Sequence, residues 1–335
     1  MNKSILVTGG TGFIGSHTCV VLLDAGYDVI VLDNLCNSDA AIIGRIGEIC
    51  GREPVFIEGD IRDADLLGDL FSQHPISAVL HFAGLKAVGE SVKNPQTYFS
   101  NNVDGTSVLL TAMQNADVKT IVFSSSATVY GDPASVPITE DFPRSAANPY
   151  GATKLKVEDI LADLVQSDPT WRIARLRYFN PVGAHESGLI GESPSGVPDN
   201  LMPFITQASA GLRDELSVFG SDYDTPDGTG IRDYIHVVDL ANGHVAALDY
   251  LTQHQEMLTV NLGTGQGVSV LEMIKAFEAV NNCTVPYRIT DRRPGDIARC
   301  WADTHLANQL LGWKAIRSLE DMCRDAWRWQ TEGAK

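Results

Sequence analysis

Short apolar runs alternate with helix-length amphipathic segments along the first half of the chain. The apolar runs have the length of buried strands and lie at 5–8, 29–32, 55–57, 78–82 and 120–123. Segments with helical spacing lie between them at 13–25, 64–71 and 95–116. Strands that alternate with helices favour a parallel sheet covered on both faces. Ligands bind such sheets at the carboxyl ends of the strands, so we expect the chemistry directly after each run.

The pattern changes after about residue 180. Residues 181–200 and 220–230 are rich in Gly, Pro and Ser, which predicts long loops over a site. A helix pattern at 239–250 leads to a strand pattern at 258–262, so we expect the chain to revisit the first domain at about 233–262. Ser269 and Glu272 form a capping-box pattern that opens a helix ending near residue 280.

The composition limits the classes of protein that this chain can belong to. It has 335 residues, 44% hydrophobic and 20% charged, which suits about two domains with a sizeable core. The 42 acidic and 25 basic residues give a net charge of −17, which argues against a nucleic-acid or anionic-membrane binder. No apolar run approaches the ~18 residues of a membrane span, and the N-terminus lacks a signal-peptide pattern, so we expect a cytoplasmic protein. The six cysteines are scattered without a C-x-x-C motif, and we expect neither a metal site nor a disulfide framework.

A glycine-rich turn joins the first strand to the first helix. Gly9, Gly12 and Gly15 let the backbone bend sharply and approach a pyrophosphate, which the free N–H groups of the helix N-terminus attract. Three glycines also suit an ordinary strand–helix turn, so the prediction depends on the ends of the next two strands. Asp33 ends the second strand, where a carboxylate hydrogen-bonds a ribose diol and repels a 2′-phosphate, so NAD is favoured over NADP. Asp60 comes after the third strand, in a position to meet the adenine.

A tyrosine and a lysine come after the fifth strand in the chain. Tyr150 and Lys154 stand at i and i+4, so they share one face of a helix. An ammonium favours a phenolate, and lowering a tyrosine pKa from ~10 to ~7 takes roughly 4 kcal/mol, which Lys154 and a nicotinamide cation together could supply. The phenolate could then take a proton from an alcohol as hydride leaves the same carbon, with Ser126 orienting the alcohol. The Y-x-x-x-K spacing alone is common on helix surfaces. Its place after a glycine-rich turn and a serine-rich strand end favours catalysis.

These motifs make the chain similar to the extended short-chain dehydrogenase/reductases and, within them, to the UDP-glucose 4-epimerases. The resemblance covers essentially the whole length and is most specific at 81–91, 176–184, 200–203 and 228–237. It implies tightly held NAD and a UDP-glucose or UDP-galactose substrate. It also implies hydride transfer from C4, rotation of the 4-keto sugar and hydride return. The expected fold is α/β: a Rossmann-type doubly wound parallel sheet in residues 1–180 and a smaller α/β substrate domain mainly in 181–335. The resemblance further implies a homodimer joined through helices at 95–116 and 150–164.

The resemblance also implies a role for individual residues. Tyr150 is the base, Lys154 tunes it and binds the nicotinamide ribose, and Ser126 orients the 4-hydroxyl. The implied cofactor positions are Gly9, Gly12, Phe13, Ile14, Gly15, Asp33, Asn34, Asn37, Ser38, Asp60, Ile61, Phe82, Ala83, Gly84, Lys86, Asn101, Ser126, Tyr150, Lys154 and Phe179. The implied substrate positions are Ser126, Tyr150, Asn180, Asn200, Leu201, Ser217, Val218, Phe219, Arg232, Arg293, Asp296 and Cys300. Phe13 departs from the Tyr of many relatives, which removes one hydroxyl hydrogen bond.

Some of these substrate positions would bind the nucleotide. Arg232 and Arg293 would bind the pyrophosphate and Asp296 the uridine ribose, while residues 217–219 would meet the uracil. An arginine is also suited to an ordinary surface ion pair, so these roles depend on the resemblance.

Cys300 carries the most informative variation. Family members restricted to UDP-glucose and UDP-galactose often have Tyr at this position, and a smaller residue accompanies acceptance of N-acetylhexosamines. The thiol leaves room beside the C2 substituent of the sugar, which predicts UDP-GlcNAc and UDP-GalNAc as further substrates. The alternative is that Cys300 is a small buried hydrophobe without this consequence.

Two other functions compete with epimerisation. A nucleotide-sugar 4,6-dehydratase needs an extra acid and base, and relatives place an Asp-Glu pair where this chain has Ala127 and Thr128. A non-catalytic NAD-sensing regulator need not keep Ser126, Tyr150 and Lys154 together, as this chain does.

Overall fold

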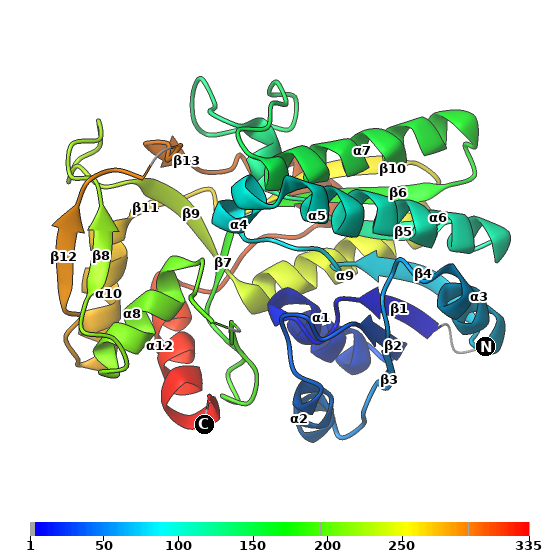
Figure 1. Cartoon of the computed structure of the whole chain (residues 1–335), viewed down its shortest axis with the longest axis horizontal. Coiled ribbons are helices and arrows are strands. Elements are labelled where there is room, and N and C mark those ends of the chain that lie inside the picture. Colours follow the sequence, from blue (N-terminus) through cyan, green and yellow to red (C-terminus); the bar gives the residue numbers. More distant parts are fainter. Residues whose placement is uncertain (1–3, 195, 294, 335) are drawn as a thin grey trace.

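The computed structural model describes residues 4–194, 196–293 and 295–334, and the largest sheet among them has seven strands (Figure 1). Its order is β10-β6-β5-β4-β1-β2-β3, and every neighbouring pair is parallel. The strands are β1 (Ser4–Thr8), β2 (Asp28–Asp33), β3 (Val55–Glu58), β4 (Ile76–His81), β5 (Thr120–Ser124), β6 (Arg172–Tyr178) and β10 (Met257–Leu262). The chain changes direction along the sheet between β1 and β4, which is where doubly wound sheets bind nucleotides. The predicted fold class is thereby confirmed.

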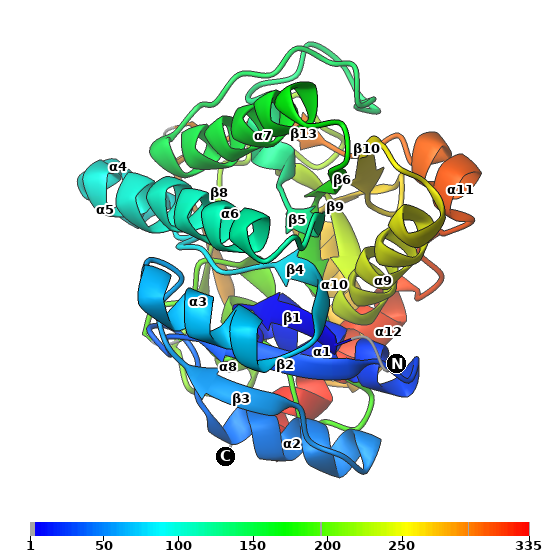
Figure 2. The ribbon, with the colours of Figure 1, turned by 90° about the vertical axis from the view of Figure 1, so that its right-hand side faces the viewer.

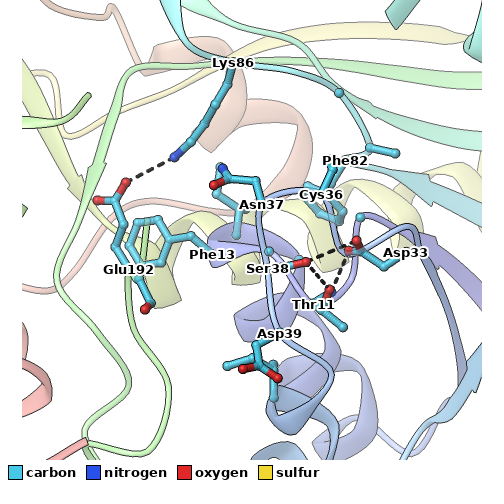
Figure 3. Close-up of a pocket in the computed structure, with 18 of the residues that line it drawn as sticks. Thr11, Phe13, Asp33, Cys36, Asn37, Ser38, Asp39, Phe82, Lys86 and Glu192 are labelled. Atoms are coloured by element: carbon cyan, nitrogen blue, oxygen red, sulfur yellow. Dashed lines mark hydrogen bonds and ion pairs between the residues drawn. The ribbon is translucent and has the colours of Figure 1, made fainter. Parts of the chain in front are cut away.

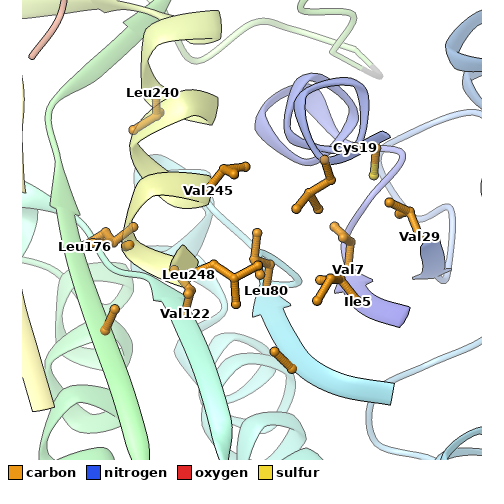
Figure 4. Packing of buried hydrophobic residues seen from close by; sticks show 14 of the residues in the cluster. Ile5, Val7, Cys19, Val29, Leu80, Val122, Leu176, Leu240, Val245 and Leu248 are labelled. Atoms are coloured by element: carbon orange, nitrogen blue, oxygen red, sulfur yellow. The ribbon is translucent and has the colours of Figure 1, made fainter. Parts of the chain in front are cut away.

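Helices cover both faces of this sheet (Figure 2). Alternate residues of β1 point to opposite faces, with Ile5 and Val7 in one core cluster and Leu6 in the other. The first cluster is covered by α1 (Phe13–Asp24), α2 (Ala41–Cys50), α9 (Val237–Gln253) and α11 (His305–Leu311), and part of it is drawn in Figure 4. The second is covered by α3 (Ala64–Gln73), α6 (Gly105–Asn115) and α7 (Pro149–Ser167). Both faces are apolar, which explains why the strands read as continuous hydrophobic runs.

The helix expected at 95–116 is interrupted. It consists of α5 (Pro95–Phe99), a π-helical segment η1 (Ser100–Asp104) and α6, and α4 (Val88–Lys93) precedes it. The wider π turn coincides with two buried asparagines, Asn101 and Asn102. The Asn102 side chain accepts from the Leu85 backbone N–H at 2.8 Å and donates to Thr153 Oγ1 at 3.0 Å. Such bulges often place functional side chains, and Asn101 is one of the predicted cofactor residues.

A smaller part of the chain packs beside the carboxyl ends of the large sheet. Its strands are β7 (Asn180–Val182), β8 (Leu216–Phe219), β9 (Ile231–His236), β11 (Gly267–Ser269), β12 (Tyr287–Thr290) and β13 (Arg299–Cys300). Its helices are α8 (Leu201–Ser209), α10 (Val270–Asn281) and α12 (Leu319–Arg328), followed by the π turn η3 (Trp329–Gly333). Ser269 and Glu272 form the predicted capping box at the start of α10.

Two features differ from the expected pattern. The run 55–57 was expected to be buried, but β3 is the last strand of the sheet and Val55 is 50% exposed. In the predicted return to the first domain, α9 and β10 belong with the large sheet, whereas β9 pairs within the smaller one. The division of the chain near residue 180 stays a prediction. Across the described residues, no helix combines the length and apolarity that a bilayer crossing needs.

Candidate active site

The glycine turn brings three backbone segments into contact. Gly9 has a φ of +72°, and a Cβ there would lie 2.7 Å from the backbone nitrogen of Ala83 at the end of β4. A Cβ on Gly15 would lie only 2.2 Å from the carbonyl oxygen of Gly9. Gly12 caps α1 without a side-chain hydrogen bond, so the first N–H groups of that helix are open to an anion.

This turn forms one wall of a cavity of about 560 Å³ (Figure 3). The ends of β1, β2, β4 and β5 and the start of α7 contribute to the same cavity. The structure brings together there the predicted residues Gly9, Gly12, Phe13, Ile14, Gly15, Asp33, Asn34, Asn37, Ser38, Ile61, Phe82, Ala83, Gly84, Lys86, Asn101, Tyr150 and Lys154. Ser126 and Phe179 do not line it.

Asp33 is held rigidly at the end of β2. Its Oδ2 accepts from the Thr11 N–H at 3.1 Å, and its Oδ1 accepts from Leu35 N at 3.0 Å and Ser38 Oγ at 3.2 Å. The side chains of Asp33, Thr11 and Ser38 converge beside the cavity in Figure 3. The carboxylate therefore has a fixed direction on the cavity wall.

Asp60 stands between two residues that line the cavity, Gly59 and Ile61. Its carboxylate accepts from Arg62 Nε at 2.8 Å, Arg62 Nη2 at 2.7 Å and Asn34 Nδ2 at 3.0 Å. Arg62 holds the pKa of this carboxyl well below its usual range. Asn34 lines the cavity and Asp60 itself does not, so a contact between Asp60 and the adenine stays a prediction.

Lys154 lies buried at the inner end of the cavity. Its Nζ donates to the Ser124 carbonyl at 2.7 Å and lies 4.9 Å from the ring centroid of Phe123. Burial lowers the pKa of Lys154 to about 8, and the Glu158 carboxylate acts in the opposite direction. The ammonium is thus the main form at neutral pH. The helix start that carries it is fixed by Asn148, whose Oδ1 accepts from Gly151 N at 2.8 Å.

Tyr150 shares this face of α7 and is also buried. Burial raises its pKa well above 10, the phenol of Tyr178 raises it further, and the hydroxyl of Ser126 lowers it. Ser126 Oγ accepts from Thr128 N at 3.2 Å and Thr128 Oγ1 at 3.0 Å. The sequence predicted that Lys154 would help to lower this pKa. Without a ligand the Tyr150 phenol stays protonated, because the cost of burying a phenolate outweighs the hydrogen bond from Ser126.

One wall of the cavity comes from segments distant in the chain from the glycine turn. Residues 191–194 belong to the loop that was predicted to lie over a site, whereas the sequence did not predict the lining by Trp329, Gly333 and Ala334. Glu192 Oε1 accepts from Lys86 Nζ at 3.1 Å and Asn200 Nδ2 at 2.6 Å, and the first contact is visible in Figure 3. Trp329 Nε1 donates to the Glu192 carbonyl at 3.1 Å.

Arg45 on α2 joins this wall to the first part of the chain. Its Nη1 donates to the carbonyls of Leu189 at 3.1 Å and Gly333 at 3.0 Å, and its guanidinium lies 5.3 Å from the Trp329 ring centroid. We call Arg45, the loop 188–192 and the turn 329–333 the clasp. Nothing in the local sequence signals these contacts, because each joins segments far apart in the chain.

Most of the predicted substrate residues do not line this cavity, and Tyr150 is the exception. Arg232 and Arg293 both pair with Asp296, at 3.7 Å and 3.0 Å, and the Arg293 guanidinium lies 4.7 Å from the ring centroid of Phe219. Cys300 is the register partner of Arg232 between β13 and β9. This Arg–Asp–Arg cluster carries one more positive than negative charge, and guanidinium groups suit phosphate oxygens.

The remaining predicted substrate residues divide into two groups. Asn200 hydrogen-bonds Glu192 on the cavity wall, and Asn180 begins β7 next to Tyr234 of β9. Leu201 and Val218 belong instead to the core of the smaller part, and the Val218 side chain is only 1% exposed. Only the backbone at Val218 could meet a ligand, whereas Ser217 is half-buried and Phe219 is exposed. The contact of residues 217–219 with the uracil stays a prediction.

Comparisons with known proteins decide the family. Residues 6–326 match a family described as GDP-mannose 4,6 dehydratase. The UDP-glucose 4-epimerase of Bacillus subtilis (strain 168) is 58% identical over 328 residues, which are 98% of this chain and 97% of that protein. This chain belongs to the UDP-glucose 4-epimerase family. The family predicted from the motifs is confirmed, and its members are isomerases.

Solved structures agree with this family. The UDP-glucose-4-epimerase of Stenotrophomonas maltophila, crystallised with NAD and formylated UDP-arabinopyranose, has a TM-score of 0.97 at 56% identity and covers 98% of both chains. The UDP-Glc/GlcNAc 4-epimerase of Campylobacter jejuni has a TM-score of 0.86 at 36% identity over 98% of this chain and 99% of that one. In the part of the chain that the structure describes, no group of three His, Cys, Asp or Glu side chains is placed to hold a metal ion.

Proposed function

We propose that this chain interconverts UDP-glucose and UDP-galactose at C4 with NAD as a resident cofactor. The observation that carries the proposal is that Tyr150 and Lys154 line the same cavity as the glycine turn and Asp33. A proton-transferring phenol and a dinucleotide site therefore share one enclosed space. The NAD-bound Stenotrophomonas relative supports this proposal.

The cavity has the features that NAD requires. Gly9 and Gly15 have no Cβ, so a pyrophosphate can come close to the backbone there. The start of α1 has no side-chain cap, so its N–H groups are available to the phosphate oxygens. The oriented Asp33 carboxylate suits a ribose diol and repels a 2′-phosphate.

The chemistry proposed for the site assigns a separate task to each side chain. NAD held by the glycine turn and Asp33 would supply a hydride acceptor and a positive charge. The Tyr150 oxygen takes the proton of the 4-hydroxyl and returns it after the 4-keto sugar has rotated to present its opposite face. Ser126 orients that hydroxyl, and the buried ammonium of Lys154 favours the phenolate during the transfer. Burial by itself keeps Tyr150 protonated. The phenolate therefore forms only when the charges of Lys154 and the nicotinamide both lie near it.

Two residues favour epimerisation over 4,6-dehydration. Ala127 and Thr128 stand where dehydratases place an acidic pair, and Thr128 Oγ1 instead donates to Ser126 Oγ. Elimination of water needs an acid and a base that these residues do not supply.

The proposal is tested by incubating the purified protein with UDP-galactose and NAD. We expect UDP-glucose of unchanged mass, measured by NMR and mass spectrometry. A product that has lost water would indicate a dehydratase. NAD binding without sugar exchange would indicate a regulator, and either result would overturn the proposal.

We further propose UDP-GlcNAc and UDP-GalNAc as substrates. Cys300 pairs with Arg232 along β9 and packs against the core cluster that contains Phe179, so it stands between the Arg–Asp–Arg cluster and the cofactor end. Burial raises the pKa of its thiol to about 11, so it acts as a neutral small side chain. The likeness to the Campylobacter jejuni UDP-Glc/GlcNAc 4-epimerase supports the proposal.

Cys300→Tyr is expected to remove the N-acetylhexosamine activity selectively. The phenol would fill the space beside the C2 substituent, so kcat/KM for UDP-GlcNAc should fall about tenfold or more, with UDP-glucose changed little. Cys300→Ser is the matched control, because it keeps the size of the side chain. Equal losses for both sugars in Cys300→Tyr, or no wild-type turnover of UDP-GlcNAc, would show that this position does not select the sugar.

We also propose the homodimer that the family resemblance implies, joined through α5–α6 and α7. Val92 on α4 and Phe99 on α5 are 63% and 39% exposed, and a dimer on this side would bury them. The mass in solution tests this, since a monomer of 36.2 kDa at micromolar concentration would contradict it.

A further inference from the structure

Glu158 is a buried carboxylate that no step of the proposed chemistry uses. It stands one helical turn beyond Lys154 on the same face of α7, and its side chain is 0% exposed. Its Oε1 accepts from Ser125 Oγ at 2.6 Å and Arg177 Nε at 2.9 Å, and its Oε2 accepts from Arg177 Nη2 at 2.7 Å. Burial acts to raise the pKa of Glu158, but Arg177 outweighs it and the pKa lies below its ordinary value. The group is therefore a charged carboxylate inside the protein.

These bonds connect Glu158 to the end of β5. Ser125 stands between Ser124, whose carbonyl holds the Lys154 ammonium, and Ser126, whose hydroxyl lies beside Tyr150. α7 is therefore tied twice to the same strand end, once through Lys154 and once through Glu158. A shift of either element would change the spacing of Ser126, Tyr150 and Lys154 together.

Glu158 also joins the end of β6 to this arrangement. Arg177 directly precedes Tyr178, which lines the cavity. Its Nη1 donates to the Tyr130 hydroxyl at 2.9 Å and to the Glu140 carbonyl at 2.9 Å. Glu158 thus connects α7, which carries Tyr150 and Lys154, with β6 through Arg177 and with the segment after β5 through Ser125, next to Ser126.

The charge of Glu158 acts on Lys154 as well. The groups around that ammonium are the Tyr150 phenol, the Ser124 carbonyl, the Phe123 ring and the imidazoles of His81 and His244. Burial lowers the pKa of both imidazoles, to about 3 for His81 and about 4 for His244, so neither is charged at neutral pH. Tyr150 is held protonated by burial. Glu158 is then the nearby opposite charge that offsets the burial of Lys154.

Arginines surround Glu158 on its other sides. Arg144 Nη1 lies 3.3 Å from its Oε2, and Arg175 Nη1 donates to its backbone carbonyl at 3.2 Å. With Arg177 included, the carboxylate faces three guanidinium groups. Removing its charge would leave these cations and Lys154 without their shared buried anion.

We propose that Glu158 is a positioning residue for the reaction, which fixes Ser126 against Tyr150 and keeps Lys154 in its ammonium form. The inference rests on the proposed function, because it concerns the same phenol and ammonium. It adds a buried anion to the serine, tyrosine and lysine.

Glu158→Gln is the direct test, because it keeps the shape and removes the charge. We expect kcat for UDP-galactose to fall about 20-fold with KM nearly unchanged, since the change affects the alignment of the reacting groups and not sugar binding. Loss of an opposite charge lowers a lysine pKa, so the alkaline limb of the kcat–pH profile should move down by about one pH unit.

The same titration is measured without turnover. In protein labelled with ¹³C-lysine, the Cε resonance of Lys154, assigned with Lys154→Arg, should titrate with a pKa of about 8 in the wild type and lower in Glu158→Gln. This readout stands even if the protein proves not to be an epimerase, so failure of this inference and failure of the proposed function are distinguishable.

Asp159→Asn is the matched control. It is the next residue of α7, and its carboxylate also pairs with Arg144, at 3.0 Å, but its side chain is 44% exposed. We expect this variant to keep the wild-type kcat and lysine titration. Ser125→Ala should lower kcat without moving the lysine titration, because it breaks the tie to β5 and keeps the charge.

If Glu158→Gln does not fold, a second variant still tests the proposal. Glu158→Gln combined with Arg177→Met removes the unpaired arginine, and buried ion pairs replaced as a unit are often tolerated. We expect a downward shift of the Lys154 titration in this double variant that is smaller than in Glu158→Gln, because loss of the Arg177 charge acts in the opposite direction. A wild-type lysine titration in either folded variant would overturn the proposal, as would an equal loss of kcat in Asp159→Asn.

Discussion

Tyr150→Phe is expected to lower kcat for UDP-galactose by about 1,000-fold, since general-base groups contribute ~10²–10⁴. The substitution removes one oxygen from a buried ring and leaves the packing of α7 in place. The glycine turn, Asp33 and the Arg–Asp–Arg cluster do not depend on that oxygen, so NAD content and UDP affinity should match the wild type. Steady-state kinetics, NAD release on denaturation and UDP titration calorimetry give the three quantities.

Tyr178→Phe is the matched control for this prediction. Tyr178 is half-buried, lines the same cavity and influences the pKa of Tyr150. We expect this variant to keep kcat within about tenfold, because its hydroxyl has no proton to move in the proposed chemistry. A larger loss in Tyr178→Phe than in Tyr150→Phe would transfer the base role to Tyr178.

Gly15→Ala is expected to weaken NAD binding by about 100-fold, which corresponds to about 2.8 kcal/mol. A methyl group at this position would lie 2.2 Å from the Gly9 carbonyl oxygen and 2.8 Å from the Gly10 Cα. These contacts are with backbone and not with a mobile side chain, so the turn itself has to move. The N–H groups at the start of α1 then lose their direction toward the pyrophosphate. Dissociation constants from calorimetry on NAD-depleted protein measure the effect.

Gly68→Ala tests whether any added methyl group has the same effect. Gly68 is exposed on α3 and no other atom lies within 4 Å of its added Cβ. We expect unchanged NAD affinity and a gain in stability of up to about 1 kcal/mol, because alanine is the better helix former. Wild-type NAD affinity in folded Gly15→Ala would refute the role of the glycine turn.

Local patterns predicted the features that depend on local geometry. Gly9 and Gly15 predict the tight turn, because a side chain does not fit at either position. The i, i+4 spacing of Tyr150 and Lys154 is enough to place both on one face of α7. The capping box of α10 was predicted for the same reason. The π segment η1 was not predicted, because the 95–116 pattern reads as a regular helix and the interruption coincides with tertiary hydrogen bonds of Asn102.

Long-range contacts account for what the sequence did not predict at the site. The hydrogen bond between Asn34 and Asp60 joins the ends of two strands, and no local pattern signals it. Val218 lies in a strand whose alternation places it in the core. Glu192 and Trp329 carry no motif, and only the folded chain brings them to the cavity.

The clasp has a consequence for how long the cofactor stays bound. Its contacts bind α2, near the start of the chain, to the turn 329–333 at its end. The proposed reaction regenerates NAD in every cycle, so the enzyme does not need to exchange it. A route by which NAD could leave the cavity would therefore offer no advantage. The dinucleotide would be enclosed by segments far apart in the chain, and its residence time would depend on how often the turn 329–333 opens. Under the proposed function, the clasp makes a diffusible coenzyme behave as a prosthetic group.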